Sequence, residues 1–136
     1  MESSQLTEIQ IKQIKDQVKQ AAYDHLHTIE TNKALSHFTE DVIAISNDTL
    51  FPSYEALAED VGAFYKILKE VNLASWDDMY INIIDVNVAS VTAKFRYSFT
   101  SIDNERTDLK GIWTAIYVLR RGKWKICLKH ETFIQL

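Results

Sequence analysis

The sequence predicts an α+β fold in which helices come first and an antiparallel β-meander follows. Over most of the first 70 residues the hydrophobic side chains recur three and four apart, as on the buried face of a helix. From Trp76 onward they alternate with polar ones, as in half-buried strands. The chain has only three glycines and one proline, so no flexible linker is visible and we expect a single domain over residues 1–136. Helices followed by such strands pack on one face of a sheet.

The first expected element is a long amphipathic helix from about Ser4 to Thr31. Either Ser4 or Thr7 is suited to cap its N-terminus, because both side chains can accept a bond from a free backbone N–H. The apolar positions that define its buried face are Ile11, Ile14, Val18, Ala21, Ala22 and Ile29.

A short helix and a strand are expected next. Asn32 is placed to cap a helix from Lys33 to Phe38, whose inward residues would be Ala34, Leu35 and Phe38. The run from Val42 to Ser46 is rich in β-branched residues and ends at Asn47-Asp48, a turn-forming pair. These features predict one strand that closes in a turn.

A third helix is expected from Ser53 to about Glu70. Ser53 follows Pro52 and can act as N-cap, and Glu55 in the first turn suits the positive end of the helix dipole. Its buried side would carry Leu57, Val61, Phe64, Tyr65 and Leu68.

Four long strands are expected in the second half of the chain. Their predicted ranges are Trp76 to Val88, Val91 to Thr100, Leu109 to Arg121 and Lys123 to Ile134. The reversals between them are expected at Asn87 with Ala89-Ser90, at Asp103-Asn104 and at Arg121-Gly122.

The third of these strands is apolar on both faces. Trp113, Ala115 and Tyr117 share one face, and the residues between them are also mostly apolar, which is typical of a central strand covered on both sides. Tyr97 belongs to a similar aromatic stripe on the preceding strand. Such stripes either fill a core or line an aromatic cavity, and the sequence leaves both interpretations open.

The last strand carries the histidine that we single out. Trp124, Ile126, Leu128 and His130 fall on one face if the alternation is regular. His130 would then place a titratable ring at the end of a hydrophobic wall, where it could act as an acid or base or contact a ligand. The alternative is a structural imidazole bonded to backbone or to a tyrosine hydroxyl.

Composition excludes several classes of protein. The net charge of -4 and the scattered basic residues argue against nucleic-acid binding. Cys127 is the single cysteine, so it has no partner for an intrachain disulfide and is expected to be a buried, inert thiol. No apolar run is long enough to cross a bilayer and no export signal is visible, so we expect a cytoplasmic protein without a membrane partner.

Neither a metal nor a cofactor is expected. The four histidines show none of the spacings typical of helical zinc sites, and His25 and His27, two apart on a helix, point in different directions. The three glycines lie too far apart to form a nucleotide-binding loop.

The element order and two short motifs resemble the nuclear transport factor 2-like superfamily, also called SnoaL-like or ketosteroid-isomerase-like. The segment ALSHFTEDV at residues 34–42 resembles the end of the second helix and the start of the first strand of that family. GKWKI at residues 122–126, followed by His130, resembles its C-terminal ending. The resemblance implies a cone-shaped curved antiparallel sheet wrapped around the long helix, with two further helices, a cavity at one end, and a homodimer formed through the outer sheet face.

The resemblance does not extend to the isomerase machinery, which needs a tyrosine, a carboxylate base and a protonated aspartate. The corresponding positions hold Ala22, Ser46 and Ala115, so steroid-type isomerisation is not expected. A shift of one or two places would bring in Tyr23 and Asp48 instead.

Other candidate residues follow from position alone. Tyr23 and His27 lie four apart and share a helix face, at the cavity mouth or on the surface, whereas His25 is expected to point elsewhere. Asp48 follows the first strand, near where this fold keeps a base, although an Asn-Asp turn also explains it.

Two functions remain open from the sequence. The first is a protein that binds a small hydrophobic or aromatic molecule, either without catalysis or as a cofactor-free enzyme that uses proton transfer. Its predicted catalytic residues are His130, Asp48 and Tyr23. Its predicted ligand-binding residues are Trp113, Tyr97, Tyr117, Phe64 and His27. The second is a non-catalytic dimerisation or protein-association module whose cavity is filled by its own side chains.

Overall fold

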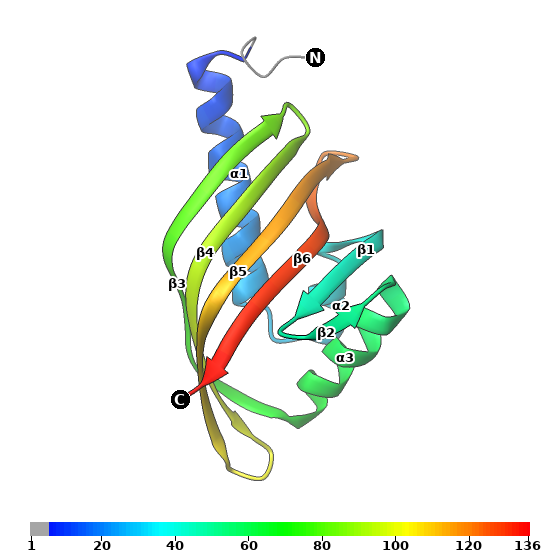
Figure 1. Cartoon of the computed structure of the whole chain (residues 1–136), viewed down its shortest axis with the longest axis vertical. Coiled ribbons are helices and arrows are strands. Elements are labelled where there is room, and N and C mark those ends of the chain that lie inside the picture. The colour runs from blue at the N-terminus through cyan, green and yellow to red at the C-terminus, as the bar shows by residue number, and fades with distance from the viewer. Residues whose placement is uncertain (1–5) are drawn as a thin grey trace.

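The computed structural model describes residues 6–136 and confirms the α+β fold (Figure 1). A long helix and two shorter helices are combined with a curved six-stranded sheet. The helices are α1 (Glu8–Leu26), α2 (Thr31–Leu35) and α3 (Tyr54–Ile67). The strands are β1 (Phe38–Ser46), β2 (Thr49–Phe51), β3 (Leu68–Asp85), β4 (Val88–Ser101), β5 (Arg106–Arg120) and β6 (Lys123–Gln135).

The strands form one open sheet in the order β2-β1-β6-β5-β4-β3. The four long strands pair antiparallel as expected, but β1 pairs parallel with β6, so the sheet is mixed rather than purely antiparallel. Figure 1 shows the long strands curving around α1, with α2 and α3 beside the short strands at one end. The curved sheet and the helices on its inner side give the predicted cone.

Helix α1 begins at Thr7 through a reciprocal cap. The Gln10 backbone N–H donates to Thr7 Oγ1 at 3.1 Å, and the Thr7 N–H donates to the Gln10 side chain at 2.9 Å. The alternative cap, Ser4, lies outside the described residues. The helix ends at Leu26, five residues before the predicted end, and Ile29 beyond it is 69% exposed instead of buried.

The segment from Thr31 to Phe51 differs from the prediction in three respects. Helix α2 begins at Thr31 after Glu30, so Asn32 lies within the helix and is not its cap. Phe38 is buried as predicted but starts strand β1. Strand β2 was not predicted, because three residues are too short to show a period.

Helix α3 confirms its predicted cap and ends earlier than predicted. Ser53 Oγ accepts from the Ala56 N–H at 3.2 Å. The helix stops at Ile67, and β3 starts at Leu68 rather than at Trp76. Pairing with β4, which begins at the Leu68–Ser101 register position, draws this segment into the sheet despite its weak alternation.

Two of the three predicted hairpin turns are confirmed. Ile102 and Asp103 form the β4–β5 turn, and Arg121-Gly122 form the β5–β6 turn with φ values of 53° and 77°, as a two-residue hairpin requires. The β3–β4 turn lies at Val86-Asn87, whereas Ala89 and Ser90 belong to β4.

A β-bulge at Cys127 changes which side chains of β6 face inward. Tyr117 pairs with Ile126 and Ile116 pairs with Leu128, so Cys127 is the extra residue between them. Because side chains alternate strictly along a strand, one extra residue exchanges the two faces of everything that follows. Ile126 is fully buried, whereas Leu128 is 40% exposed on the outer face.

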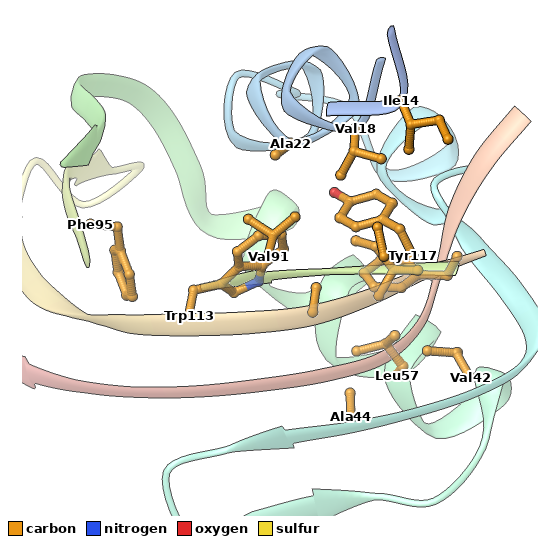
Figure 2. Close-up of a cluster of buried hydrophobic side chains, with 14 residues drawn as sticks. Ile14, Val18, Ala22, Val42, Ala44, Leu57, Val91, Phe95, Trp113 and Tyr117 are labelled. Carbon is orange, nitrogen blue, oxygen red and sulfur yellow. The ribbon is translucent and has the colours of Figure 1, made fainter. Parts of the chain in front are cut away.

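The core lies between α1 and the inner face of the sheet (Figure 2). Figure 2 shows Ile14, Val18 and Ala22 of α1 above Val91 and Tyr117 of the sheet. The buried helix residues are spaced four apart, which confirms the predicted amphipathic face. On the other side of the same cluster Leu57 of α3 packs with Val42 and Ala44 of β1. Within the described part of the chain, none of the helices has the length and hydropathy to cross a membrane.

Candidate functional site

A cavity of about 570 Å³ lies inside the cone, bordered by α1, α3, the β1–β2 turn and the inner face of β3 to β6. This volume falls within the usual range for small-molecule sites. Its walls are largely aromatic, from Phe64, Trp76, Phe95, Tyr97, Trp113 and Phe133. The core described above fills the opposite end of the cone, so the aromatic stripes serve as core at one end and as cavity wall at the other.

Two tryptophans form one wall of the cavity. The rings of Trp76 and Trp113 lie 4.6 Å apart between centroids with an interplanar angle of 33°. Trp76 Nε1 donates to the Ala22 carbonyl at 2.9 Å, which ties β3 to α1. These contacts hold flat apolar surfaces in place before any ligand arrives, so little conformational entropy is lost on binding.

His25 brings an imidazole to this apolar wall. It follows the buried row Ile14, Val18 and Ala22 on α1, and its ring packs on Trp113 at 6.2 Å and edge-on against Phe38 at 5.2 Å. Burial lowers the pKa of His25 from 6.5 to about 3, with smaller contributions from the nearby positive charge of His37 and Lys129. His25 is therefore a neutral imidazole bordering the cavity at neutral pH.

A second imidazole contacts His25 from the outside. The Nδ1 atoms of His25 and His37 lie 2.9 Å apart, so one donates a hydrogen bond to the other. His37 is half-buried at the junction of α2 and β1, where its N–H donates to Ala34 O and its carbonyl accepts from the Ile126 N–H. Burial lowers the pKa of His37, whereas the neighbouring Asp24 carboxylate acts in the opposite direction.

The bulge at Cys127 turns an ion pair of β6 into the cavity. Lys129 Nζ donates to Glu131 Oε1 at 2.8 Å, with side chains only 13% and 21% exposed, and both residues line the cavity. Other ion pairs of the described residues, such as Arg96 with Asp77, lie on the surface. The cavity therefore offers a cation and a carboxylate side by side among aromatic rings.

Asp48 stands at the mouth of the cavity in the β1–β2 turn. The turn is fixed to β6 by Asn47, whose N–H donates to Glu131 O and whose Oδ1 accepts from the Phe133 N–H, each at 2.8 Å. Asn47 has a φ of 52°, which asparagine tolerates better than most residues. Asp48 lines the cavity as expected for a residue that follows the first strand.

Two tyrosines add hydroxyl groups to the lining. Tyr65 donates to Thr28 O at 2.9 Å, and burial raises its pKa. The pKa of Tyr97 is also raised by burial, with Tyr65 contributing. Both rings are neutral phenols at neutral pH, available to bond a polar group of a ligand.

The structure places three of the five predicted ligand-binding residues at the cavity. Trp113, Tyr97 and Phe64 line it. Tyr117 is buried in the core and does not border the cavity, because it lies further toward the filled end of the cone. His27 lies beyond the end of α1, with Nδ1 donating to Tyr23 O at 2.9 Å, and borders a smaller surface cavity against β3.

The predicted catalytic residues are separated by the fold. Asp48 lies at the cavity mouth, but Tyr23 stacks on His27 with centroids 6.2 Å apart, away from the lining. The expectation that His130 continues the inward row of Trp124 and Ile126 is wrong, because the bulge turns it to the exposed outer face. His25, expected to point in a different direction from Tyr23 and His27, does so, and its ring borders the cavity.

The sequence contained one signal for His25 and none for the ion pair. His25 lies three residues after Ala22, which continues the buried row of α1, so helical spacing alone indicates an inward ring. Lys129 and Glu131 alternate with apolar residues and read as solvent-facing unless the bulge is known. Among the described residues, no group of three or more possible metal ligands is close together.

Comparison with solved structures shows a nuclear transport factor 2-like fold. A candidate scytalone dehydratase from Novosphingobium aromaticivorans superposes with a TM-score of 0.86 at 10% identity, over 94% of this chain and 89% of that one. The hexachlorocyclohexane dehydrochlorinase LinA-type3 from Novosphingobium barchaimii gives 0.76 at 11% identity, over 96% and 94%. A nuclear transport factor 2-like protein from Salmonella enterica serovar Typhimurium gives 0.79 at 14% identity, over 89% and 91%.

These likenesses concern the fold, since sequence identity is low throughout. Neither a protein-family model nor a curated protein matches the sequence.

Proposed function

We propose that this protein binds a flat, uncharged aromatic molecule in the cavity of the cone. The observation that carries the proposal is a cavity of about 570 Å³ with largely aromatic walls, which also holds His25 and the Lys129–Glu131 pair. Trp76, Trp113 and Phe64 offer ring faces for stacking, which favours a planar ligand. A polar substituent of the ligand would meet His25 and the Lys129–Glu131 pair.

Charge selects against an anionic ligand. The lining contains one lysine and three carboxylates, Asp48, Asp60 and Glu131, so its formal charge is -2 with His25 neutral. Lys129 is already paired with Glu131 and offers no free cation for a ligand carboxylate. A neutral hydroxyl suits the pair better, because it can donate to Glu131 and accept from Lys129.

A thermal-shift comparison of 2-naphthol with 2-naphthoate tests this proposal. The two compounds share one ring system and differ in charge at neutral pH. At about a hundred times its dissociation constant, 2-naphthol should stabilise the protein by about 2.7 kcal/mol, which for a domain of this size is roughly 8–10 °C. The naphthoate should stabilise it much less.

Two variants provide the controls. Asp48→Asn removes one negative charge of the lining and should bring naphthoate closer to naphthol. His130→Ala lies outside the lining and should leave the naphthol shift unchanged. Equal shifts by both compounds would contradict the charge argument, and no shift by either would contradict aromatic ligand binding.

Proton transfer is the chemistry that this site would support. The neighbours described as a dehydratase and a dehydrochlorinase carry out, by their names, eliminations that remove a proton. In this chain the neutral imidazole of His25 borders the cavity and can exchange a proton with a bound molecule. We therefore extend the proposal to a cofactor-free enzyme in which His25, rather than His130, handles the proton.

A homodimer is the second proposal, and the outer sheet face supports it. There the bulge places Leu128 between Ile43 of β1 and Ile116 of β5, while Ile112 and Ile134 extend the apolar surface. We call these five residues the outer patch. Thr114 and His130 lie between the two groups of this patch. Apolar side chains gathered on one exposed sheet face typically mark an interface.

Sedimentation velocity tests the dimer. The wild type should sediment as a dimer, and Leu128→Glu, which places a charge between Ile43 and Ile116 in the outer patch, should sediment as a monomer. Tyr80→Glu is a matched control, because Tyr80 is 71% exposed on β3 at the far edge of the sheet and should leave the dimer intact. A wild type that remains monomeric at high concentration would contradict the proposal.

A further inference from the structure

His25 and His37 connect the cavity to the protein surface through one hydrogen bond. Their Nδ1 atoms lie 2.9 Å apart, with His25 bordering the cavity and His37 half-buried toward solvent. The rings meet edge to face, with centroids 5.1 Å apart and an interplanar angle of 74°. Both backbones are fixed, one on α1 and the other by bonds to Ala34 and Ile126.

This contact links the tautomers of the two rings. A hydrogen bond between two Nδ1 atoms needs one proton, so exactly one ring donates. If His37 donates, His25 carries its proton on Nε2 and offers the cavity a donor. If His25 donates, its Nε2 is a free base. No protein hydrogen bond of the described residues uses His25 Nε2, so that atom is left for a ligand.

We infer that His25 and His37 form a two-imidazole relay that moves a proton between a molecule in the cavity and solvent. The inference rests on the proposed function, since it assigns the pathway for the proton that His25 would handle. His25 Nε2 takes a proton from the bound molecule while the proton on Nδ1 passes to Nδ1 of His37. His37 then releases its own Nε2 proton to water, so neither ring gains a net charge at the end.

The relay resolves a difficulty of the buried base. A ring enclosed by Trp113 and Phe38 holds a positive charge poorly, so His25 alone would not keep an accepted proton. Passing the second proton outward to His37 avoids a lasting buried cation. His37 acts here as a positioning and relay residue, because it contacts His25 but does not itself line the cavity.

The surrounding charges set the direction of the relay. Burial opposes the charged form of His37, as do Lys33 on α2 and Lys125 on β6, whereas Asp24 on α1 favours it. On the cavity side, Lys129 opposes a charge on His25. The cationic state of the pair is therefore favoured on the surface ring, where Asp24 is the nearby acid. When His37 is charged it must donate, which holds His25 in the Nε2–H form.

Long-range ¹H–¹⁵N correlation spectra of the histidine rings test the relay in the free protein, recorded from about pH 8 downward through the titration of His37. As His37 gains its proton, the His25 signals should move toward the Nε2–H tautomer while His25 stays neutral. In His37→Phe the His25 tautomer should no longer change with pH. Signals of the exposed rings are assigned with His27→Gln and His130→Gln, each of which removes one set.

Several outcomes would overturn the relay. In the wild type, the His25 tautomer could stay unchanged while His37 titrates, or His25 could become a cation over this range. In His37→Phe, the pH response of His25 could stay as it is in the wild type. The wild-type spectra alone decide the first two, even if the variant does not fold. A purely structural His37 would alter the melting temperature without linking the two tautomers.

The same spectra separate this inference from the proposed function. Adding 2-naphthol should move the His25 Nε2 signals more than those of His37, because only His25 borders the cavity. If the two tautomers are linked but 2-naphthol does not bind, the ligand proposal is contradicted, and the hydrogen-bonded link between the two imidazoles remains supported. Binding without linked tautomers would contradict the relay alone.

Discussion

Lowering the pH from about 7 to about 4 should cost the protein about 3 kcal/mol of unfolding free energy through His25 alone. The folded protein keeps this ring neutral with a pKa of about 3, whereas the unfolded chain protonates it below its ordinary pKa of 6.5. The unfolded state therefore binds more protons between these values, and stability falls as the pH falls. His37, whose pKa is also lowered, contributes in the same direction.

Denaturant unfolding at several pH values, for the wild type and His25→Phe, measures this effect. The free energy of His25→Phe should fall less steeply between about pH 6.5 and 4, because the variant lacks one group that the unfolded state protonates. Ile126→Val is the matched control. It should lower stability by about 0.5–1.5 kcal/mol at every pH without changing the slope.

Surface carboxylates do not obscure this comparison. Hydrogen bonds from Arg96 and Ser75 hold the pKa of Asp77 below its usual range, so its contribution to stability is present above its usual pKa of 3.8 and is lost as the pH falls from there through the lowered pKa. This loss is the same in the wild type and in His25→Phe, so it does not change the difference between their slopes. Identical slopes for the wild type and His25→Phe between pH 6.5 and 4 would show that His25 is not the buried neutral ring described above.

Lys129→Met should destabilise the protein by about 2–3 kcal/mol, because it leaves the Glu131 carboxylate without its partner inside the cavity. This figure lies below the 3–5 kcal/mol typical of fully buried pairs, since both side chains keep some access to the cavity. In the double variant Lys129→Met with Glu131→Gln no charge remains, so stability should return to within about 1 kcal/mol of the wild type.

A double-mutant cycle measured by denaturant unfolding gives the coupling directly. The matched control is Arg106→Met, which breaks an exposed pair with Asp108 and should cost less than about 1 kcal/mol. Equal costs for the buried and the exposed pair would contradict the placement of Lys129 and Glu131 in the cavity. The double variant should also lose naphthol binding if the pair bonds the ligand hydroxyl.

Much of the fold was predictable because its signals are local. The spacing of Ile14, Val18 and Ala22 indicates one buried helix face. Ser53 and Thr7 indicate where helices begin, because a cap involves only neighbouring residues. The Arg121-Gly122 turn likewise depends on its own backbone angles. The starts of β3 and β4 were missed, because strand ends depend on the partner strand.

The candidate site was predictable only where it lies on regular elements. Trp113, Tyr97 and Phe64 were found because strand and helix periodicity held around them. His130 and the Lys129–Glu131 pair were misplaced together, for one reason. A single unpaired residue, Cys127, exchanges the faces of β6, and nothing near Cys127 in the sequence signals a bulge.

The sequence by itself determined the α+β class, the order of the long elements and the aromatic character of the inner face. These features depend on hydrophobic periodicity and on turn residues, which involve only residues close together in the chain. Only the tertiary structure decided that His130 faces outward, that an ion pair lines the cavity, and that His37 bonds His25 from outside. Those contacts join residues far apart in the chain, or depend on one residue of strand register, and no local pattern encodes either.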